Sequence, residues 1–463
     1  MVVQKFGGSS VADAQKIREV AKIALDHQID GTIAIVLSAM KGTTDLLLEA
    51  AHDSQAGKAA YRETFAQLKK RHFDAAEQLA TGVSFQELKA ALEQSFNDLA
   101  DILHGVELVK ECSKRSLDLI AGFGEQLNCQ LMTGYLKSEK HEAHYIDARE
   151  KFIVTNDKHG SAAVDFDATY RCVRERLTPL HGVLVITGFI SSTADGRPTT
   201  LGRNGSDYTA SLVGAAIHAD AVEIWKDVDG VLTADPRFVR DTIVLDEISM
   251  EEAMELSYFG AKVIHPSTML PLLERGIPLR IKNTLNPSVK GTLIRQNPKP
   301  HPYAITGIAS ITGAALINIE GSGMIGIPGF ASRVFGALAQ AQVNVIMISQ
   351  ASSEHSICIV CRDHEADTAL KALRNELKIE HQAHQLKDCE LRRGLEVIAV
   401  IGENMRGRPG ITGRLFSSLG SANINVLAIA QGSSERNISF VIESKDREVA
   451  LNTIHAAFLG KGA

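Results

Sequence analysis

Short apolar runs alternate with stretches of helical periodicity through the first 296 residues of the chain. Residues 2–6, 32–40 and 182–190 are predominantly apolar, which is typical of strands buried on both faces of a sheet. Beyond residue 13, apolar side chains recur at helical spacing, for example at Ile17 and Val20. Strands that alternate with helices predict an α/β fold, in which ligands bind at the carboxyl ends of the strands.

A long helical stretch interrupts this alternation at residues 58–110. It is rich in Ala, Leu, Glu, Lys and Gln, and its pattern breaks near Gly82. We interpret the stretch as a helical insertion in the α/β domain and as a candidate lid.

The last third of the chain contains an internal repeat. Residues 330–361 match residues 411–442 with a shift of 81 positions, which pairs Arg333 with Arg414 (414 − 333 = 81). Each copy reads as strand, glycine-rich loop, helix, strand, turn and strand, which predicts two small α/β modules that form a paired regulatory or binding unit.

A proline-rich stretch between the two halves is typical of a linker. We therefore predict a first domain at 1–296, a linker at 297–304 and modules at 305–390 and 391–463, with a last strand that could pair with the first module.

The composition excludes several classes of function. The net charge of −6 gives no support to binding of nucleic acid or of an anionic membrane, and no apolar run is long enough to span a bilayer. Six cysteines in 463 residues are typical of a reducing compartment. With a strand predicted from residue 2 and no basic leader, we expect a cytoplasmic protein.

Two short motifs resemble known sites without their context. Cys358 and Cys361 form a CxxC, but residues three apart on a strand point to opposite faces, so no metal site is expected. Residues 321–326 read GxGxxG, but the acidic residue expected about 20 positions later in a dinucleotide site is missing.

Three places carry candidate chemistry at predicted strand ends or helix starts. Lys5 precedes Gly7 and Gly8, which suits an anion that approaches backbone amides, although a tight turn beside a solvated lysine fits equally well. Arg203 lies in a glycine-bracketed turn and offers a fork to a carboxylate or phosphate, whereas Asp207 could simply cap the next helix.

Glu125 is an acid within an apolar helical run. It is either an exposed residue or an acceptor for a cation, and on its own the pattern favours exposure. The hydroxyls of Ser38 and Thr44 follow the second predicted strand, where capping of the next helix is the common alternative.

These residues belong to an ordered set of motifs that resembles the aspartokinase family. The set covers essentially the whole chain and consists of KFGGSS (5–10), VLSA (36–39), Thr44, GE (124–125), TGF (187–189), LGRNGSDYTA (201–210), DVDG (227–230), DPR (235–237) and FGAKVIHP (259–266), followed by two ACT-like modules. The repeats also contain SSEHS, SSERN and AQGSSE, which are most similar to the kinase half of bifunctional aspartokinase–homoserine dehydrogenases. Whether the chain is monofunctional or a part of such a protein is left open.

The resemblance implies an amino-acid-kinase three-layer sandwich with a mainly parallel sheet, followed by two α+β ACT-like modules. It implies transfer of the γ-phosphoryl group of ATP to the β-carboxylate of L-aspartate, the first step towards lysine, threonine and methionine, with Mg²⁺ carried by the nucleotide phosphates. Positioning and charge neutralisation dominate such a reaction.

Residue roles follow from the same resemblance. Lys5 and Asp207 are the implied catalytic pair. The implied ATP contacts are Lys5, Phe6, Gly7, Gly8, Lys226, Asp227, Leu232, Arg237 and Lys262, and the implied aspartate contacts are Ser38, Thr44, Glu125, Phe189, Arg203 and Ser206. Lys226 and Leu232 depart from the residues common in relatives, which concerns nucleotide affinity rather than the chemistry.

The ACT-like modules imply an amino-acid sensor and a homodimer or higher homo-oligomer. Gln350 and Gln431 occupy equivalent strand ends and match effector positions, with threonine as the favoured inhibitor and lysine as the alternative. Contacts of these glutamines across a module interface are the competing interpretation.

Two other functions stay open. The chain could phosphorylate another small carboxylate, although an acid at Glu125 suits a free ammonium and not an acetylated amine. It could also be a non-catalytic effector-binding protein, against which Lys5, Asp207 and Lys262 argue.

Overall fold

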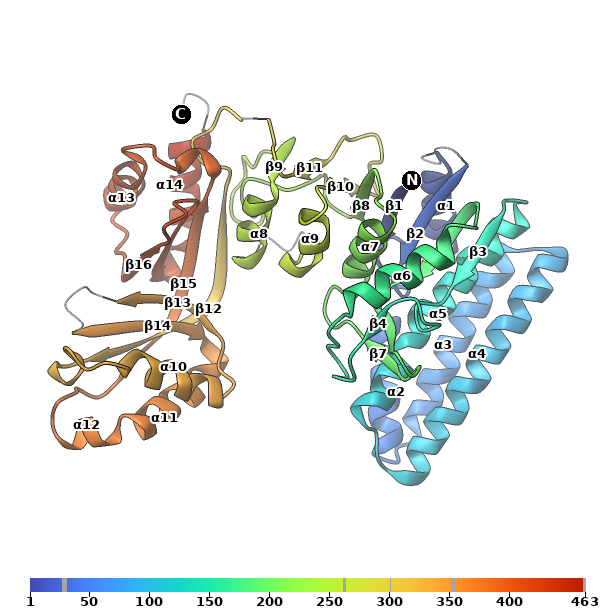
Figure 1. Ribbon diagram of the computed structural model, residues 1–463, viewed down its shortest axis with the longest axis horizontal. Helices are drawn as coiled ribbons and strands as arrows, with labels where there is room; N and C mark the ends of the chain where they lie inside the picture. The colour runs from blue at the N-terminus through green and yellow to red at the C-terminus, as the bar shows by residue number, and fades with distance from the viewer. Residues whose placement is uncertain (27–30, 261–263, 300, 351–354, 461–463) are drawn as a thin grey trace. The chain divides into compact units, whose positions relative to one another are not determined.

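The computed structural model describes residues 1–26, 31–260, 264–299, 301–350 and 355–460, and these form two compact units. The first unit comprises Met1–Val231, Asp246–Met250 and Val263–Pro298. The second comprises Leu232–Leu245, Glu251–Lys262 and Lys299–Ala463. Each unit is described by itself (Figure 1).

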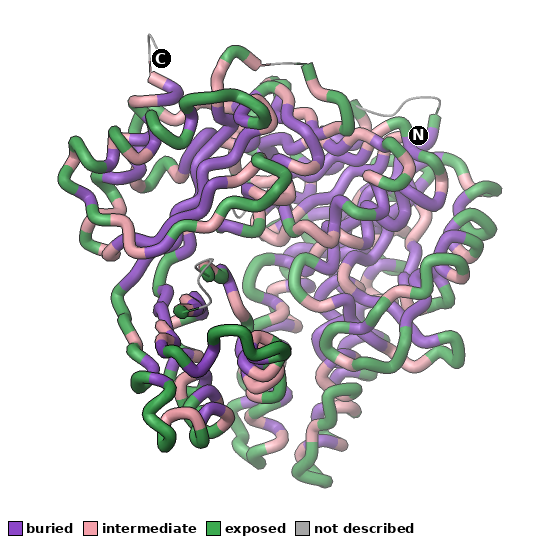
Figure 2. Tube along the Cα trace, turned by 60° about the vertical axis from the view of Figure 1, so that its left-hand side comes forward, coloured by how far each residue is buried: buried purple, intermediate pink, exposed green. Residues whose placement is uncertain are grey.

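An eight-stranded sheet forms the centre of the first unit, in the order β3-β5-β2-β1-β8-β10-β11-β9. Its strands are β1 (Val2–Phe6), β2 (Thr32–Leu37), β3 (Ala143–Ile146), β5 (Gly182–Thr187), β8 (Ala221–Lys226), β9 (Glu247–Ser249), β10 (Leu279–Asn283) and β11 (Thr292–Arg295). The six strands from β3 to β10 are parallel, and β10 pairs with β11 in antiparallel fashion. The buried purple strands of Figure 2 match the continuously apolar runs of the sequence.

Helices cover both faces of this sheet, as the predicted three-layer fold requires. The helices of the first unit are α1 (Ala14–Asp26), α2 (Thr43–Gln55), α3 (Ala60–Leu79), α4 (Gly82–Val109), α5 (Lys114–Ser138), α6 (Phe166–Leu177), α7 (Gly205–Ala216) and α9 (Pro266–Leu273). Ile33, Ile35 and Leu37 face the core shared by α1 to α5, and the alternation of a strand turns Ala34 and Val36 to the other face. There α7 packs on the sheet, and α6 and α9 pack on α7.

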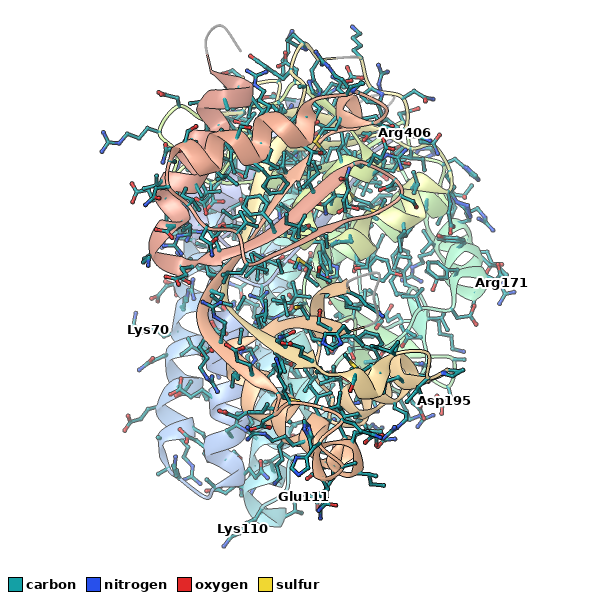
Figure 3. All side chains as sticks on the ribbon, turned by 90° about the vertical axis from the view of Figure 1, so that its left-hand side faces the viewer. Lys70, Lys110, Glu111, Arg171, Asp195 and Arg406 are labelled. Atoms are coloured by element: carbon teal, nitrogen blue, oxygen red, sulfur yellow. The ribbon has the colours of Figure 1, made fainter. Side chains whose placement is uncertain are left out.

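The predicted helical insertion is the pair α3 and α4, which run side by side next to α5 (Figure 1). Their apolar faces, with Leu92 and Phe96 buried, belong to the same core as the sheet. At the far end of the pair, Lys110 and Glu111 point outward into solvent (Figure 3). The insertion therefore extends the core of the first unit.

A small second sheet supports the loops above the carboxyl ends of the main strands. It consists of β4 (Val154–Thr155), β6 (Ile190–Thr193) and β7 (Pro198–Thr200). The hydroxyl of Thr199 lies 2.6 Å from that of Thr155 and 2.9 Å from that of Ser191, all three of them buried. The hairpin from β6 to β7 is thus fixed from within.

The second unit contains the repeat as two modules on one six-stranded sheet, in the order β13-β14-β12-β15-β17-β16. Its elements are β12 (Gly307–Glu320), α10 (Phe330–Gln340), β13 (Val345–Gln350), β14 (Ser356–Arg362), α11 (Ala366–Glu376), α12 (Lys378–Gln382), β15 (Glu390–Ile401), α13 (Ile411–Ser421), β16 (Ala428–Gln431), β17 (Asn437–Glu443) and α14 (Arg447–Leu459), together with α8 (Met250–Tyr258), which begins in the first unit. The first strands of the two modules, β12 and β15, pair in antiparallel fashion. The two modules are therefore joined by the pairing of β12 with β15. The sequence allowed the last strand of the second module to pair with the first module, but β17 pairs with β15 and β16.

Two segments of the predicted first domain belong to the second unit, namely 232–245 and 251–262. Asn452 of α14 donates a 2.8 Å hydrogen bond to the Phe238 carbonyl, and the Thr233 hydroxyl lies 3.0 Å from His455 Nε2. The second unit thus holds two stretches that the sequence order assigns to the domain before it.

The structure explains both the CxxC and the GxGxxG motif without a ligand site. Cys361 is buried in β14, whereas Cys358 is half-buried and donates to Asn318. In the GxGxxG stretch, a Cβ on Gly321 would lie 2.3 Å from the Gln385 carbonyl oxygen, so glycine is needed there for close backbone packing.

Candidate active site

A pocket of about 400 Å³ opens at the carboxyl ends of β1, β2, β5 and β8 in the first unit. Its wall includes ten of the residues predicted from the sequence, namely Lys5, Gly8, Ser38, Thr44, Glu125, Phe189, Arg203, Ser206, Asp207 and Lys226. Those residues come from sequence positions as far apart as 5 and 226, and the parallel sheet brings them to one edge. Their grouping agrees with the general position of ligand sites in α/β folds.

Asp207 lies between two lysines in the wall of the pocket. Lys5 Nζ is 2.5 Å from Asp207 Oδ1, and Lys226 Nζ is 3.4 Å from Asp207 Oδ2. Lys5 stands near the end of β1 and Lys226 at the end of the neighbouring β8, while Asp207 is in the first turn of α7. The carboxylate is therefore an orienting group for two cations, rather than the helix cap that its position alone suggested.

Burial and charge act in opposite directions on these groups. Burial alone would raise the pKa of Asp207, but the charges of Lys5 and Lys226 outweigh it and hold the pKa below its usual value. Burial also lowers the pKa of Lys226, which the Asp207 carboxylate partly opposes. Two cations around one anion leave a net positive charge on this group of side chains, as a site for polyanionic phosphates requires.

Glu125 also lines the pocket and is 4% exposed, so the exposure that its sequence pattern favoured is wrong. One carboxylate oxygen accepts a 3.1 Å hydrogen bond from the Ala39 amide, whereas the other is buried without a hydrogen-bond partner. Burial raises the pKa of Glu125 to about 8. A buried carboxylate with a free oxygen is costly unless a cationic ligand approaches it.

Arg203 stands on the turn between β7 and α7. The turn uses left-handed backbone at Gly202 (φ 75°) and at the N-cap residue Asn204 (φ 58°). The Arg203 side chain is exposed and has no hydrogen bond or ion pair within the described part of the chain. Its guanidinium is thus available to a carboxylate.

Phe189 adopts a left-handed conformation beside this turn, with φ at 66°. Its amide donates to the Thr209 hydroxyl at 3.2 Å, and its carbonyl accepts from the Leu201 amide at 2.9 Å. Non-glycine residues rarely adopt this conformation, and its persistence at a pocket wall is typical of a functional site.

Two glycines after β1 allow close approach of other groups. A Cβ on Gly8 would lie 2.7 Å from the Ala39 carbonyl oxygen, and one on Gly7 would lie 3.6 Å from Lys5 Nζ. Gly8 therefore permits the contact between the first two strand–helix loops, and Gly7 keeps the space beside the Lys5 ammonium open.

Several predicted nucleotide residues lie outside the pocket wall. The Phe6 ring is fully buried and stacks on Trp225 at 5.7 Å, so only its main chain is available to a ligand. Asp227 is exposed. Leu232 and Arg237 belong to the second unit, where Arg237 pairs with Asp235 at 2.5 Å.

The predicted phosphate-binding Lys262 lies outside the residues that the structure describes.

Three polar wall residues were not predicted as site residues: Lys41, Asp45 and Asn204. Each is close in sequence to a predicted residue, since Lys41 precedes Thr44 by three positions, Asp45 follows it in the first turn of α2, and Asn204 follows Arg203. Their position on glycine-containing turns at strand ends was the available signal.

In the second unit, Gln431 lines a hollow of about 310 Å³ formed with the glycine-rich loop of the second module. Glu435 lines the same hollow and accepts a 2.6 Å hydrogen bond from the Gly407 amide. Gln350 ends β13 as Gln431 ends β16, and both glutamines are exposed.

The described residues contain no group of three or more His, Cys, Asp or Glu side chains that could hold a metal ion. Among the same residues, no helix is both long and apolar enough to cross a membrane.

Comparison with known proteins places this geometry in a family. Residues 1–283 match the amino acid kinase family, and residues 317–377 and 398–458 each match an ACT domain. The bifunctional aspartokinase/homoserine dehydrogenase 2 of Arabidopsis thaliana is 36% identical over 98% of this chain and 50% of its own length. Aspartokinase 3 of the same plant is 33% identical over 98% of this chain and 81% of its own length.

Solved structures agree with the sequence matches. Escherichia coli aspartokinase III, in complex with aspartate and ADP, is 31% identical with a TM-score of 0.79, and the match covers 99% of each chain. Clostridium acetobutylicum aspartate kinase is 28% identical with a TM-score of 0.83, over 99% of this chain and all of that one.

The chain spans about half the length of the bifunctional relatives that it matches. The predicted fold, a kinase sandwich followed by two ACT modules, is confirmed by both family models and by the solved structures. The chain belongs to the amino acid kinase family and, within it, to the aspartokinases.

Proposed function

We propose that the protein transfers the γ-phosphoryl group of ATP to the β-carboxylate of L-aspartate and forms 4-phospho-L-aspartate. The observation that carries this proposal is one pocket lined by two contrasting groups of charged side chains, which we assign to a phosphoryl end and a substrate end. The first group has two lysines around the buried Asp207, and the second has a buried carboxylate with one unpaired oxygen and a guanidinium without a partner among the described residues. Support also comes from E. coli aspartokinase III, whose structure was solved with aspartate and ADP.

At the cationic end, Lys5 stabilises the charge that spreads over the phosphoryl oxygens during transfer. Asp207 fixes the ammonium groups of Lys5 and Lys226, so neither has to reorganise during the reaction. ATP brings Mg²⁺ on its phosphates, where the ion neutralises charge between the β- and γ-oxygens. The amides of Gly7 and Gly8 and the residues Phe6, Asp227, Leu232, Arg237 and Lys262 complete the proposed nucleotide contacts.

At the other end, the pocket recognises a free α-amino acid. The ammonium group of aspartate binds the free oxygen of Glu125, and the α-carboxylate binds Arg203. Ser38, Thr44, Ser206 and Phe189 bound the space between these two groups. With its backbone end held in this way, aspartate directs its β-carboxylate towards Lys5.

The ACT modules bind a feedback inhibitor through Gln350 and Gln431, with threonine favoured and lysine next. The hollow of about 310 Å³ beside Gln431 has the size of a free amino acid site and is bordered by backbone groups of a glycine-rich loop. A second structure of E. coli aspartokinase III, to which this chain is 30% identical, is a complex with lysine and aspartate. The enzyme would act as a homo-oligomer at the entry to the synthesis of lysine, threonine and methionine.

Trapping of the acyl phosphate with hydroxylamine tests the reaction directly. Incubation with ATP, Mg²⁺ and L-aspartate is expected to give the hydroxamate, with formation suppressed by threonine. Suppression by lysine alone would overturn the choice of effector. Turnover of another carboxylate, with none of aspartate, would identify a sister kinase; the ammonium acceptor Glu125 argues against an N-acetylated substrate.

A further inference from the structure

Asp118 is a buried carboxylate outside the pocket wall that joins three separate segments of the first unit. It lies on α5 and is 5% exposed. The Thr200 hydroxyl donates to Asp118 Oδ1 at 2.6 Å, and the Gly160 amide lies 3.1 Å from Oδ1 and 3.0 Å from Oδ2. His159 Nδ1 is 2.9 Å from Oδ2. Both carboxylate oxygens are therefore fully used.

Two of these contacts flank the turn that carries Arg203. Thr200 is the last residue of β7 and stands three positions before Arg203. Gly160 also packs closely against this turn, because a Cβ on Gly202 would lie only 3.2 Å from the Gly160 carbonyl oxygen. The Thr200 carbonyl also accepts a 2.9 Å hydrogen bond from the Ala162 amide, which ties the two segments together.

The same helix carries the other half of the substrate site. Glu125 follows Asp118 by seven residues, or two turns of α5. A rigid helix therefore fixes the proposed ammonium acceptor, and through Asp118 it also holds the base of the proposed carboxylate clamp. The distance between ammonium and carboxylate in an α-amino acid is fixed, so the spacing of Glu125 and Arg203 has to match it.

We propose that Asp118 is a positioning residue that sets the Arg203 turn at the distance from Glu125 which an α-amino acid requires. This inference rests on the proposed function, because it assigns Arg203 and Glu125 to the two charged groups of the substrate. Asp118 itself touches neither substrate nor nucleotide, and it acts through Thr200 and Gly160. Its loss should weaken binding of aspartate and leave the phosphoryl end unaffected.

The test compares Asp118→Asn with the wild-type enzyme in the hydroxamate assay. The amide keeps the size of the carboxylate but replaces one acceptor oxygen with a donor, which opposes the Gly160 amide or His159. We expect KM for aspartate to rise about tenfold or more, with kcat and KM for ATP within about twofold of wild type. Unchanged KM for aspartate, or an equal rise in both KM values, would overturn the proposal. A purely structural role would lower the melting temperature without this selectivity.

Two substitutions at Thr200, and the Asp118→Asn substitution in an Arg203→Ala enzyme, make the test more specific. Thr200→Val removes the hydroxyl donor and should raise KM for aspartate, whereas Thr200→Ser retains the donor and should resemble wild type. In an Arg203→Ala background, Asp118→Asn should cause no further loss of kcat/KM for aspartate, and an additive loss would contradict action through Arg203. If the wild-type enzyme does not turn over aspartate, the proposed function itself is overturned. If the wild-type enzyme turns over aspartate and the Asp118→Asn variant has the same kinetics, only the role of Asp118 is overturned.

Discussion

The two ends of the pocket solve the problem of buried charge in opposite ways. At the end with Lys5, Asp207 and Lys226, every charge has a partner in the protein, and the pKa of Asp207 is held low by the lysines despite burial. At the end with Glu125 and Arg203, one carboxylate oxygen and one guanidinium lack partners among the described residues, and burial raises the pKa of Glu125 to about 8. The paired end is organised before any ligand arrives, whereas the unpaired end is completed by the ligand.

Removal of Lys5 should produce the largest effect. Lys5→Ala takes one of two cations from Asp207 and from the transferring phosphoryl group, so we expect kcat to fall by about 10²–10³-fold with KM for aspartate changed much less. Steady-state kinetics with the hydroxamate assay measures both values. Lys22→Ala, at an exposed position of α1, is the control and should match wild type. Near-normal turnover of Lys5→Ala would remove Lys5 from the chemical step.

Loss of charge at the unpaired end should affect binding more than turnover. Glu125→Gln removes the negative charge that pairs with the substrate ammonium, so we expect KM for aspartate to rise by about 10- to 100-fold with KM for ATP near its normal value. Glu49→Gln on α2, at an exposed position, is the matched control. A rise in KM for ATP that equals the rise for aspartate would break the division between the two ends.

The glutamines of the ACT modules resemble the unpaired end, because their side chains have no hydrogen-bond partner among the described residues. Gln431→Ala and Gln350→Ala should each raise the inhibitor concentration for half-maximal inhibition by about fivefold, with basal kcat unchanged. Inhibition curves with threonine and with lysine measure the shift. Gln67→Ala on α3 is the control. Unaltered inhibition in both variants would mean that these glutamines serve only the module structure.

The smallest expected effect is on stability in the absence of ligand. The pKa of Glu125 is 4.5 as a free side chain and about 8 in the folded protein, so between these values the folded state holds a proton that the unfolded chain has released. The stabilisation that this proton provides is complete below pH 4.5 and is lost as the pH rises through 8. We therefore compare the melting temperature of Glu125→Gln with that of wild type at two pH values. The difference, variant minus wild type, should be larger at pH 9 than at pH 5 by at least about 2–4 °C. An identical difference between the two proteins at both pH values would show that Glu125 does not titrate in this range.

Local sequence patterns predicted the elements but not the environment of single side chains. Continuous apolar runs identified β1, β2 and β5, and the shift of 81 residues identified two modules of one design. The position of Glu125 on a helix was also clear, but its burial depends on contact with the loop after β2, at Ala39. No periodicity within α5 encodes that contact.

Contacts between segments distant in the sequence could not be predicted from local sequence patterns either. Asp207 meets Lys5 and Lys226 because β1 and β8 are neighbours in the sheet, and strand order is not written in the sequence of either strand. Segments 232–245 and 251–260 pack with the second unit although they lie within the kinase sequence. The family resemblance grouped the site residues only because their order along the chain matched the family's motifs.

The single tryptophan of the chain gives the first unit an optical signal of its own. Trp225 is fully buried in β8, stacks on Phe6, and donates a 3.0 Å hydrogen bond to Glu223. Lys226 follows Trp225 in the sequence, and Lys5 precedes Phe6, the partner of Trp225 in the neighbouring strand; these are the two lysines of the pocket. Tryptophan fluorescence therefore reports the unfolding of the kinase sheet and the binding of a charged ligand beside it. The ACT modules contain no tryptophan and contribute nothing to this signal.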